Sequence, residues 1–232
     1  IYSKKNYESE IYVANRLKIL NESNNIKYIK NINQMIEEME NEEEISLSQK
    51  QKEAINKIND NNLCIITGGP GTGKTTVIKT IIDIYKRKKM KPVLCAPTGR
   101  ATKRMTEATG EEAKTLHRLL EIGKVEDMQK QEEIDITPID ADIIIIDEMS
   151  MVDLFLMSCI MKGTYIGTKI VFVGDTDQLP SVGAGNVLKD MINSECIPTV
   201  VLDEIFWQAA QCKIVVNSHR VNKGEAFTTE NK

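Results

Sequence analysis

Short apolar runs alternate with amphipathic segments along most of the chain. The apolar runs predict buried strands, which we place at Leu63–Ile66, Val93–Ala96, Ile143–Ile146, Ile170–Val173 and Thr199–Val201. Apolar positions at helical spacing predict helices after them, at Lys74–Lys88, Arg100–Ala108, Val152–Ile160 and Asn186–Ile192. Strands that alternate with helices are typical of a mostly parallel sheet covered on both faces, so the predicted fold class is α/β.

The first part of the chain has a different pattern. Apolar side chains at helical spacing predict one helix over Tyr7–Leu20 and a second one around Ile32–Met39. The second helix runs into glutamates between Glu37 and Glu44, which form either an interaction surface or a solvated helix end or linker; the latter is the simpler interpretation. We expect a helical segment with an acidic linker over residues 1–46 and the α/β domain over residues 47–224.

Composition removes several classes of protein. The 232 residues are 41% hydrophobic, enough for a core, and a net charge of −4 excludes a wholly basic nucleic-acid binder but allows a local basic face. The longest aliphatic run is Ile143–Ile146, so we expect no membrane span. Five scattered cysteines without a CxxC pair predict reduced thiols and a cytoplasmic location. Because the chain begins at Ile1, we expect it to be part of a longer protein.

The strongest motif is a glycine-rich loop between a predicted strand and a predicted helix. The segment from Gly68 to Thr75 fits the pattern G-x-x-x-x-G-K-[ST]. Its backbone N–H groups can cradle phosphates, Lys74 can reach the β- and γ-phosphates, and the Thr75 hydroxyl can ligate Mg²⁺. A chance glycine-rich turn is a much rarer explanation. The predicted nucleotide contacts are Gly69, Pro70, Gly71, Thr72, Gly73, Lys74, Thr75 and Thr76.

Two carboxylates follow the apolar run Ile143–Ile146. Ligands of doubly wound sheets bind where parallel strands end, so Asp147 and Glu148 are expected near the glycine-rich loop. Asp147 is the second candidate for holding Mg²⁺, and Glu148 is the candidate general base for the attacking water. An aliphatic strand that ends in Asp-Glu is a weak signal alone, but downstream of a phosphate-binding loop it becomes a strong one.

Two glutamines complete the candidate nucleotide site. Gln178 follows another predicted strand and could sense the γ-phosphate, although Gly, Asp and Pro around it also fit a plain turn. Gln51 has an amide that can pair with the adenine edge, and Ser48 before it is a good N-cap for a helix. A capped surface helix is the simpler explanation for that segment.

A locally basic stretch offers a candidate nucleic-acid contact. Between Lys91 and Lys124 there are seven Lys or Arg residues and four Asp or Glu residues. A loop with a hydroxyl, backbone amides and an arginine at the end of a strand suits a phosphate backbone. A capped helix with a solvated basic face explains the charge equally well. The candidate nucleic-acid contacts are Pro97, Thr98, Gly99, Arg100, Thr115 and His117.

Together these motifs resemble the first motor domain of a superfamily 1 DNA helicase, and most closely the RecD-like family, which includes the alpha subunit of exodeoxyribonuclease V. The most specific blocks are Ala96–Ala101 and Gly174–Gly183. The resemblance implies a RecA-like P-loop fold and the use of ATP with Mg²⁺. It also implies 5′-to-3′ translocation on single-stranded DNA and unwinding at duplex junctions, in DNA repair and recombination.

The resemblance also implies parts that this chain lacks or changes. A second RecA-like domain completes the ATP site in the family, and residues 225–232 are expected to be a tail that enters it. Residues 123–138 occupy the place of a small pin that splits duplex DNA. After Phe206 the family usually has an arginine that touches the γ-phosphate, whereas this chain has Trp207. We therefore expect the chain alone to bind nucleotide without unwinding.

Two other functions fit some of these residues. A non-catalytic module could bind nucleotide and DNA without turnover, and Trp207 favours that interpretation. An AAA+ loader would also contain a phosphate-binding loop, but the segment Gly174–Pro180 argues against it. ATP turnover with and without single-stranded DNA distinguishes the three possibilities.

Overall fold

The computed structural model describes residues 3–24, 27–122, 136–204, 213–222 and 224–226. A six-stranded sheet lies at the centre, and every strand pairing in it is parallel. The strands follow the spatial order β3-β2-β4-β5-β1-β6. They are β1 (Leu63–Thr67), β2 (Pro92–Ala96), β3 (Ala113–Thr115), β4 (Ile143–Ile146), β5 (Lys169–Gly174) and β6 (Thr199–Val201).

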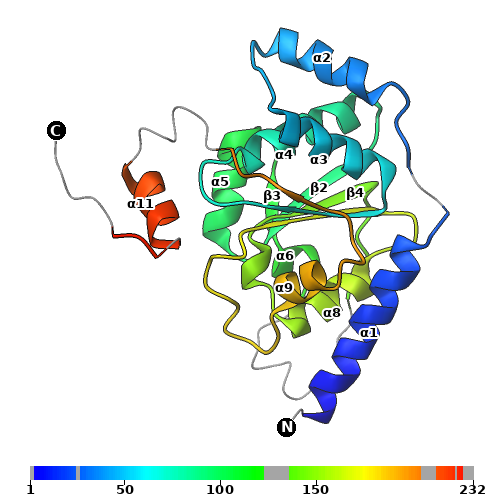
Figure 1. Ribbon diagram of the computed structural model, residues 1–232. Helices are drawn as coiled ribbons and strands as arrows, with labels where there is room; N and C mark the ends of the chain where they lie inside the picture. The colour runs from blue at the N-terminus through cyan, green and yellow to red at the C-terminus, as the bar shows by residue number, and fades with distance from the viewer. Residues whose placement is uncertain (1–2, 25–26, 123–135, 205–212, 223, 227–232) are drawn as a thin grey trace.

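Helices cover both faces of the sheet, as the alternating pattern predicts (Figure 1). An upper layer in Figure 1 consists of α2 (Ile32–Glu42), α3 (Gln49–Asp60), α4 (Lys74–Arg87) and α5 (Gly99–Thr109). A lower layer consists of α1 (Lys4–Asn21), α6 (Leu116–Leu119), α8 (Leu154–Gly163) and α9 (Val187–Asn193). A short 3₁₀ helix, Met149–Met151, follows β4, and α11 (Lys213–Asn222) lies to one side of both layers.

Each helical layer packs on its own half of the core. Successive residues of a strand point to opposite faces, so Ile66 packs with the upper layer and Ile65 with the lower one. The four isoleucines of β4 alternate in the same way, and each is at most 1% exposed. Burying a side chain of this size stabilises the fold by about 1.5–3 kcal/mol. A strand buried on both faces is continuously apolar, which is why the apolar runs in the sequence predict these strands.

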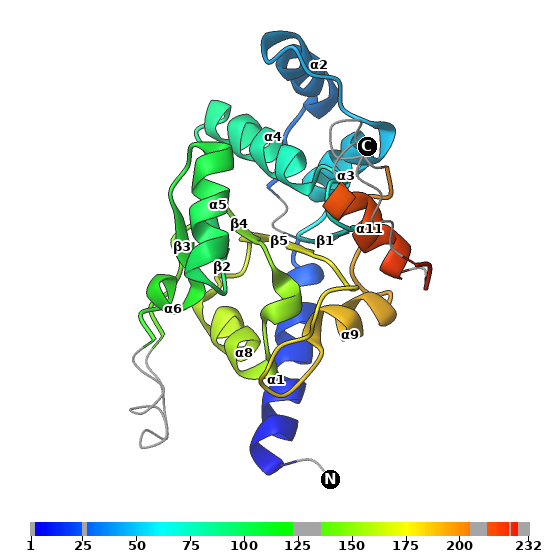
Figure 2. The ribbon, with the colours of Figure 1, turned by 90° about the vertical axis from the view of Figure 1, so that its left-hand side faces the viewer.

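The N-terminal helices pack directly on the domain. Figure 2 shows α1 under the sheet beside α8, where the Arg16 guanidinium donates a hydrogen bond to the carbonyl of Thr164 at 2.8 Å. Within the upper layer, α2 packs on α3 and α4. Its acidic end forms ion pairs with α3 and α4: Glu40 with Lys52 (2.7 Å), Glu42 with Arg87 (2.5 Å) and Glu43 with Lys79 (2.5 Å). Much of the acidic run therefore faces basic residues of the same chain.

Most of the predicted elements are confirmed with small shifts of their ends. The predicted helix Val152–Ile160 begins later, at Leu154, because the Asp153 carboxylate accepts a hydrogen bond from the N–H of Leu156 and caps the helix there. The strand β3 was not predicted. It is a three-residue edge strand with an exposed Lys114 at its centre, so it carries no apolar run. The boundary at residue 47 stays a prediction.

Candidate nucleotide site at the carboxyl edge of the sheet

The glycine-rich loop joins the end of β1 to the start of α4. Gly73 precedes the helix with a φ of 83°, a left-handed conformation that glycine adopts without a steric penalty. Gly68 is needed for a different reason, since a Cβ there would lie 2.4 Å from the carbonyl oxygen of Leu202. The Thr72 hydroxyl donates to the carbonyl of Gly69 at 2.9 Å. The loop is thus held open in front of a helix N-terminus, where backbone N–H groups favour an anion.

Lys74 is the cation at the base of this loop. Its ammonium donates hydrogen bonds to the carbonyl oxygens of Gly68 (2.5 Å) and Gly69 (2.9 Å). Burial lowers the pKa of Lys74, whereas the nearby carboxylates, with Asp175 first and then Asp147, raise it. A partly buried ammonium among carboxylates and loop carbonyls is well placed to exchange those carbonyls for phosphate oxygens.

Gln51 ties α3 to the same loop. Its side-chain carbonyl accepts from the N–H of Ser48 at 2.8 Å, and Ser48 accepts from the N–H of Gln51, so the two residues form a capping box. The predicted N-cap is therefore confirmed. The Gln51 amide nitrogen also donates to the carbonyl of Gly73 at 3.2 Å. The predicted adenine contact of Gln51 stays a prediction, and this geometry gives the residue a second role in positioning the loop.

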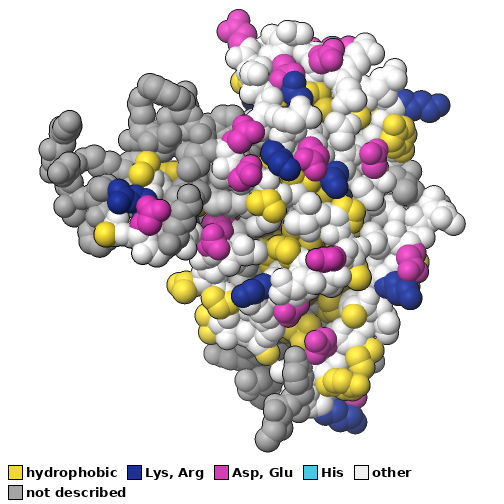
Figure 3. Space-filling view, in the orientation of Figure 1, with side chains coloured by type: hydrophobic (Ala, Val, Ile, Leu, Met, Phe, Trp, Pro, Cys, Tyr) yellow, Lys and Arg dark blue, Asp and Glu magenta, His cyan; other side chains and the backbone are white. Residues whose placement is uncertain are grey.

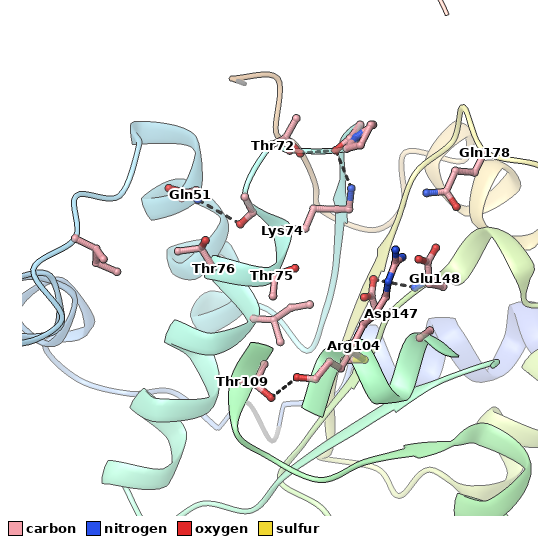
Figure 4. A pocket seen from close by; sticks show the side chains of 18 of the residues that line it. Gln51, Thr72, Lys74, Thr75, Thr76, Arg104, Thr109, Asp147, Glu148 and Gln178 are labelled. Atoms are coloured by element: carbon pink, nitrogen blue, oxygen red, sulfur yellow. Dashed lines mark hydrogen bonds between the residues drawn. The ribbon is translucent and has the colours of Figure 1, made fainter. Parts of the chain in front are cut away.

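Asp147 and Glu148 project from the end of β4 towards the loop (Figure 4). Burial raises the pKa of both carboxyl groups; for Glu148 the neighbouring Asp147 raises it further, while Lys74 and Arg104 oppose the increase. Glu148 has a φ of 55°, which is uncommon for a residue with a side chain, and its N–H donates to the Asp147 carboxylate at 2.8 Å. Backbone strain of this kind tends to occur at functional sites.

These groups surround one cavity of about 760 Å³. The nucleotide-site residues predicted from the sequence, from Gly69 to Thr76 and also Gln51, Asp147, Glu148 and Gln178, all line it. Figure 4 shows Gln178 across the opening from Lys74. The hydroxyl of Thr75 and the carboxylate of Asp147 provide the oxygen ligands that Mg²⁺ prefers, so the donor set fits the metal that the sequence implies.

Two residues near the site were not predicted. Asp175, which follows β5, is 3% exposed, and its charge acts on Lys74. Arg104 of α5 lines the cavity, and its positive charge acts on Glu148 (Figure 4). The sequence could have indicated Asp175, because this carboxylate lies at the end of a predicted strand. For Arg104 the sequence shows only one cation in a basic stretch.

The candidate DNA contacts lie near the ends of β2 and β3, at the same edge of the sheet. The Thr98 and Thr115 hydroxyls accept hydrogen bonds from N–H groups one turn into α5 and α6. Both are thus helix caps, as the simpler explanation required. Arg100 and His117 are exposed. A Cβ on Gly99 would meet nothing within 4 Å, so the fold does not require glycine there. These DNA contacts, including Pro97, stay predictions.

Comparison with known proteins shows to which family the chain belongs. A family model described as an AAA domain matches residues 51–184, a range that includes the glycine-rich loop, the Asp147–Glu148 pair and Gln178. The chain belongs to this family. The chain is 37% identical over 180 residues to the ATP-dependent RecD2 DNA helicase of Deinococcus radiodurans, covering 78% of this chain and 24% of that protein.

A second relative is the RecBCD enzyme subunit RecD of Buchnera aphidicola, 34% identical over 209 residues, with 82% of this chain and 34% of that subunit covered. The chain thus spans a quarter to a third of the length of these relatives. The RecD-like assignment made from the motifs is confirmed, because the relatives of this chain include the ATP-dependent RecD2 DNA helicase and the RecD subunit of the RecBCD enzyme.

Solved structures support the fold. Pif1 helicase from Candida albicans has a TM-score of 0.54 and 24% identity, with 77% of this chain and 44% of that chain covered. A structure of two coordinating Pif1 helicases at forked double-stranded DNA has a TM-score of 0.56 and 21% identity, with 80% and 50% covered. The predicted RecA-like P-loop fold is confirmed. Among the described helices, none has the length and apolar composition of a membrane span.

Three expectations fall outside the described residues. Trp207, which replaces the arginine expected from the family, lies in the range 205–212. Most of the proposed pin lies in the range 123–135, and most of the expected C-terminal tail in the range 227–232.

Proposed function

We propose that this chain is the ATP-binding motor domain of a RecD-like DNA helicase. The observation that carries the proposal is that Lys74, Glu148 and Gln178 face one cavity although they come from three separate segments of the chain. A phosphate cradle alone would suit many nucleotide-binding proteins. A cradle together with a candidate base and a polar sensor suits the hydrolysis of a terminal phosphate.

Each residue has a defined task in this proposal. The loop N–H groups and Lys74 hold the phosphates, and Thr75 with Asp147 would hold Mg²⁺, which would offset negative charge when bound. Glu148 orients the attacking water and accepts its proton. Burial raises the pKa of Glu148, which makes the carboxylate a better proton acceptor as long as it remains ionised. Gln178 contributes a neutral amide on the side where a γ-phosphate would lie.

The proposal also includes the finer expectations from the sequence. Mg²⁺ is the metal, single-stranded DNA and duplex junctions are the nucleic-acid partners, and the cytoplasm is the compartment. Translocation runs 5′ to 3′ and requires a second motor domain, because a single domain has no partner against which it can open and close during ATP hydrolysis. The chain by itself is expected to bind nucleotide and to hydrolyse it very slowly.

Two binding measurements test this function on the chain itself. Calorimetry with ATP should give binding in the presence of Mg²⁺ and much weaker binding after chelation with EDTA. Fluorescence anisotropy should show that a labelled single strand binds and that added salt weakens binding. Absence of nucleotide binding would refute the motor-domain assignment. Nucleotide binding without any DNA binding would contradict the helicase part of the proposal and leave a nucleotide-binding domain of another function.

A further inference from the structure

Helix α5 forms one wall of the nucleotide cavity. Ala101, Met105 and Thr109 recur every four residues, which places them along one face of the helix, and all three line the cavity. Arg104 lies beside this row. Among the described residues that line the cavity, the cations are Lys74, at the end of the glycine-rich loop, and Arg104. Its side chain rises from α5 towards the end of β4 (Figure 4).

Arg104 differs from the basic residue next to it. Lys103 lies 3.9 Å from Glu107, one turn further along the exposed face of the helix. Arg104 has no carboxylate within 4.0 Å among the residues that the structure describes. A guanidinium whose charge acts on Glu148 without forming an ion pair with it keeps its donors available for a ligand.

The charge around this position favours a further cation once a nucleotide enters. Asp147 and Glu148 already place negative charge in the cavity, and a nucleoside triphosphate adds more. Arg104 lines the same cavity as Lys74 and Glu148, and its charge acts on Glu148. The planar guanidinium can donate two parallel hydrogen bonds to phosphate oxygens, which an ammonium cannot do.

We propose that Arg104 binds the terminal phosphate of ATP and thereby makes the site prefer ATP to ADP. The inference rests on the proposed function, since it assumes that the cavity holds a nucleotide with its phosphates on the glycine-rich loop. Lys74 sits under the loop and can contact phosphates that both nucleotides share. Arg104 comes from α5, a separate element of the cavity wall, and its charge acts on the candidate base Glu148. Only a third phosphate would extend towards that base.

The test compares two nucleotides on four proteins. Calorimetry with Mg²⁺ measures the affinity for a non-hydrolysable ATP analogue and for ADP on the wild type and on Arg104→Ala, Arg104→Lys and Lys103→Ala. Arg104→Ala should weaken binding of the analogue about tenfold, the usual effect of one lost charged hydrogen bond, and change ADP binding less than about twofold. Arg104→Lys keeps the charge and should lose less, whereas Lys103→Ala should change neither affinity.

The ADP measurement is also the control for folding. Unchanged ADP affinity shows that an Arg104 variant is intact, so a selective loss of analogue binding supports the inference. An equal loss for both nucleotides, or no loss, would overturn the preference while leaving the proposed function in place. If the wild-type chain bound neither nucleotide, both the inference and the proposed function would fail.

Discussion

The two edges of the sheet each bury a lysine, and the two lysines have opposite roles. At the carboxyl edge, Lys74 donates to two carbonyls of the glycine-rich loop. At the amino edge, Lys169 is 1% exposed and donates to the carbonyls of Ile58 (2.9 Å), Asn59 (2.8 Å) and Asn61 (2.6 Å) at the end of α3. Burial lowers the pKa of Lys169 to about 8, so it remains mostly charged at neutral pH.

The difference lies in what surrounds each ammonium. Lys169 has three N–H donors and three acceptors, so its hydrogen bonding is complete. Nearby, Asp142 is paired with Lys27 and also accepts from the backbone N–H of Lys91 at 2.6 Å. At the carboxyl edge, by contrast, Asp147 and Glu148 line an open cavity. One edge satisfies its charges internally, whereas the other keeps them available for a ligand.

The largest expected effect is at the carboxyl edge, on catalysis. In a protein that also carries the second motor domain, Glu148→Gln should lower DNA-stimulated ATP turnover by about 10²- to 10⁴-fold, because an amide cannot accept the proton of the attacking water. Nucleotide affinity should change little, which calorimetry can check. Glu107→Gln on the exposed face of α5 is the control and should keep full turnover. Wild-type turnover by Glu148→Gln would remove Glu148 from the mechanism.

At the amino edge we expect the largest effect on stability. Lys169→Met leaves two buried carbonyl oxygens and one partly buried carbonyl oxygen without this donor, and should lower the free energy of unfolding by about 3 kcal/mol. Urea unfolding measures this loss, and Lys162→Met, on an exposed side chain, should stay within about 0.5 kcal/mol of the wild type. The affinity of the folded Lys169→Met protein for nucleotide should be unchanged. A loss of affinity as large as the loss of stability would mean that the two edges are not independent.

Lys74→Ala tests the carboxyl edge, where we expect a change in nucleotide affinity but not in stability. The variant should weaken Mg²⁺–ATP binding by about 10- to 100-fold, because a charged contact to the phosphates disappears. It should not lower the free energy of unfolding, because burial already disfavours the charge of this lysine. Lys79→Ala, on the outer side of the same helix, should leave nucleotide affinity unchanged. Equal affinities for wild type and Lys74→Ala would contradict the assigned cradle.

The contrast between the edges also explains what could be predicted from the sequence. The carboxyl edge was predictable because the phosphate cradle needs consecutive residues with fixed backbone conformations, such as Gly73 before Lys74. The role of Lys169 was not, because its three acceptors lie more than 100 residues earlier in the chain. Arg104 was missed for a related reason, since only the folded structure shows that its side of α5 lines the cavity that Glu148 also lines.

The smallest effect should come from the candidate DNA contacts. Arg100→Ala should weaken single-stranded DNA binding by a few fold, about 1 kcal/mol, and equally for all sequences, since phosphate contacts carry no base information. The slope of log affinity against log salt should also become shallower by about 1.

Lys88→Ala is the matched control, because Lys88 follows the C-terminus of α4 at the amino edge and should not contact the DNA. Anisotropy titrations between about 50 and 200 mM salt measure both quantities. If Lys88→Ala changed the slope as much as Arg100→Ala, the positive charge would act from the whole surface, and the assignment of DNA to the carboxyl edge would be wrong.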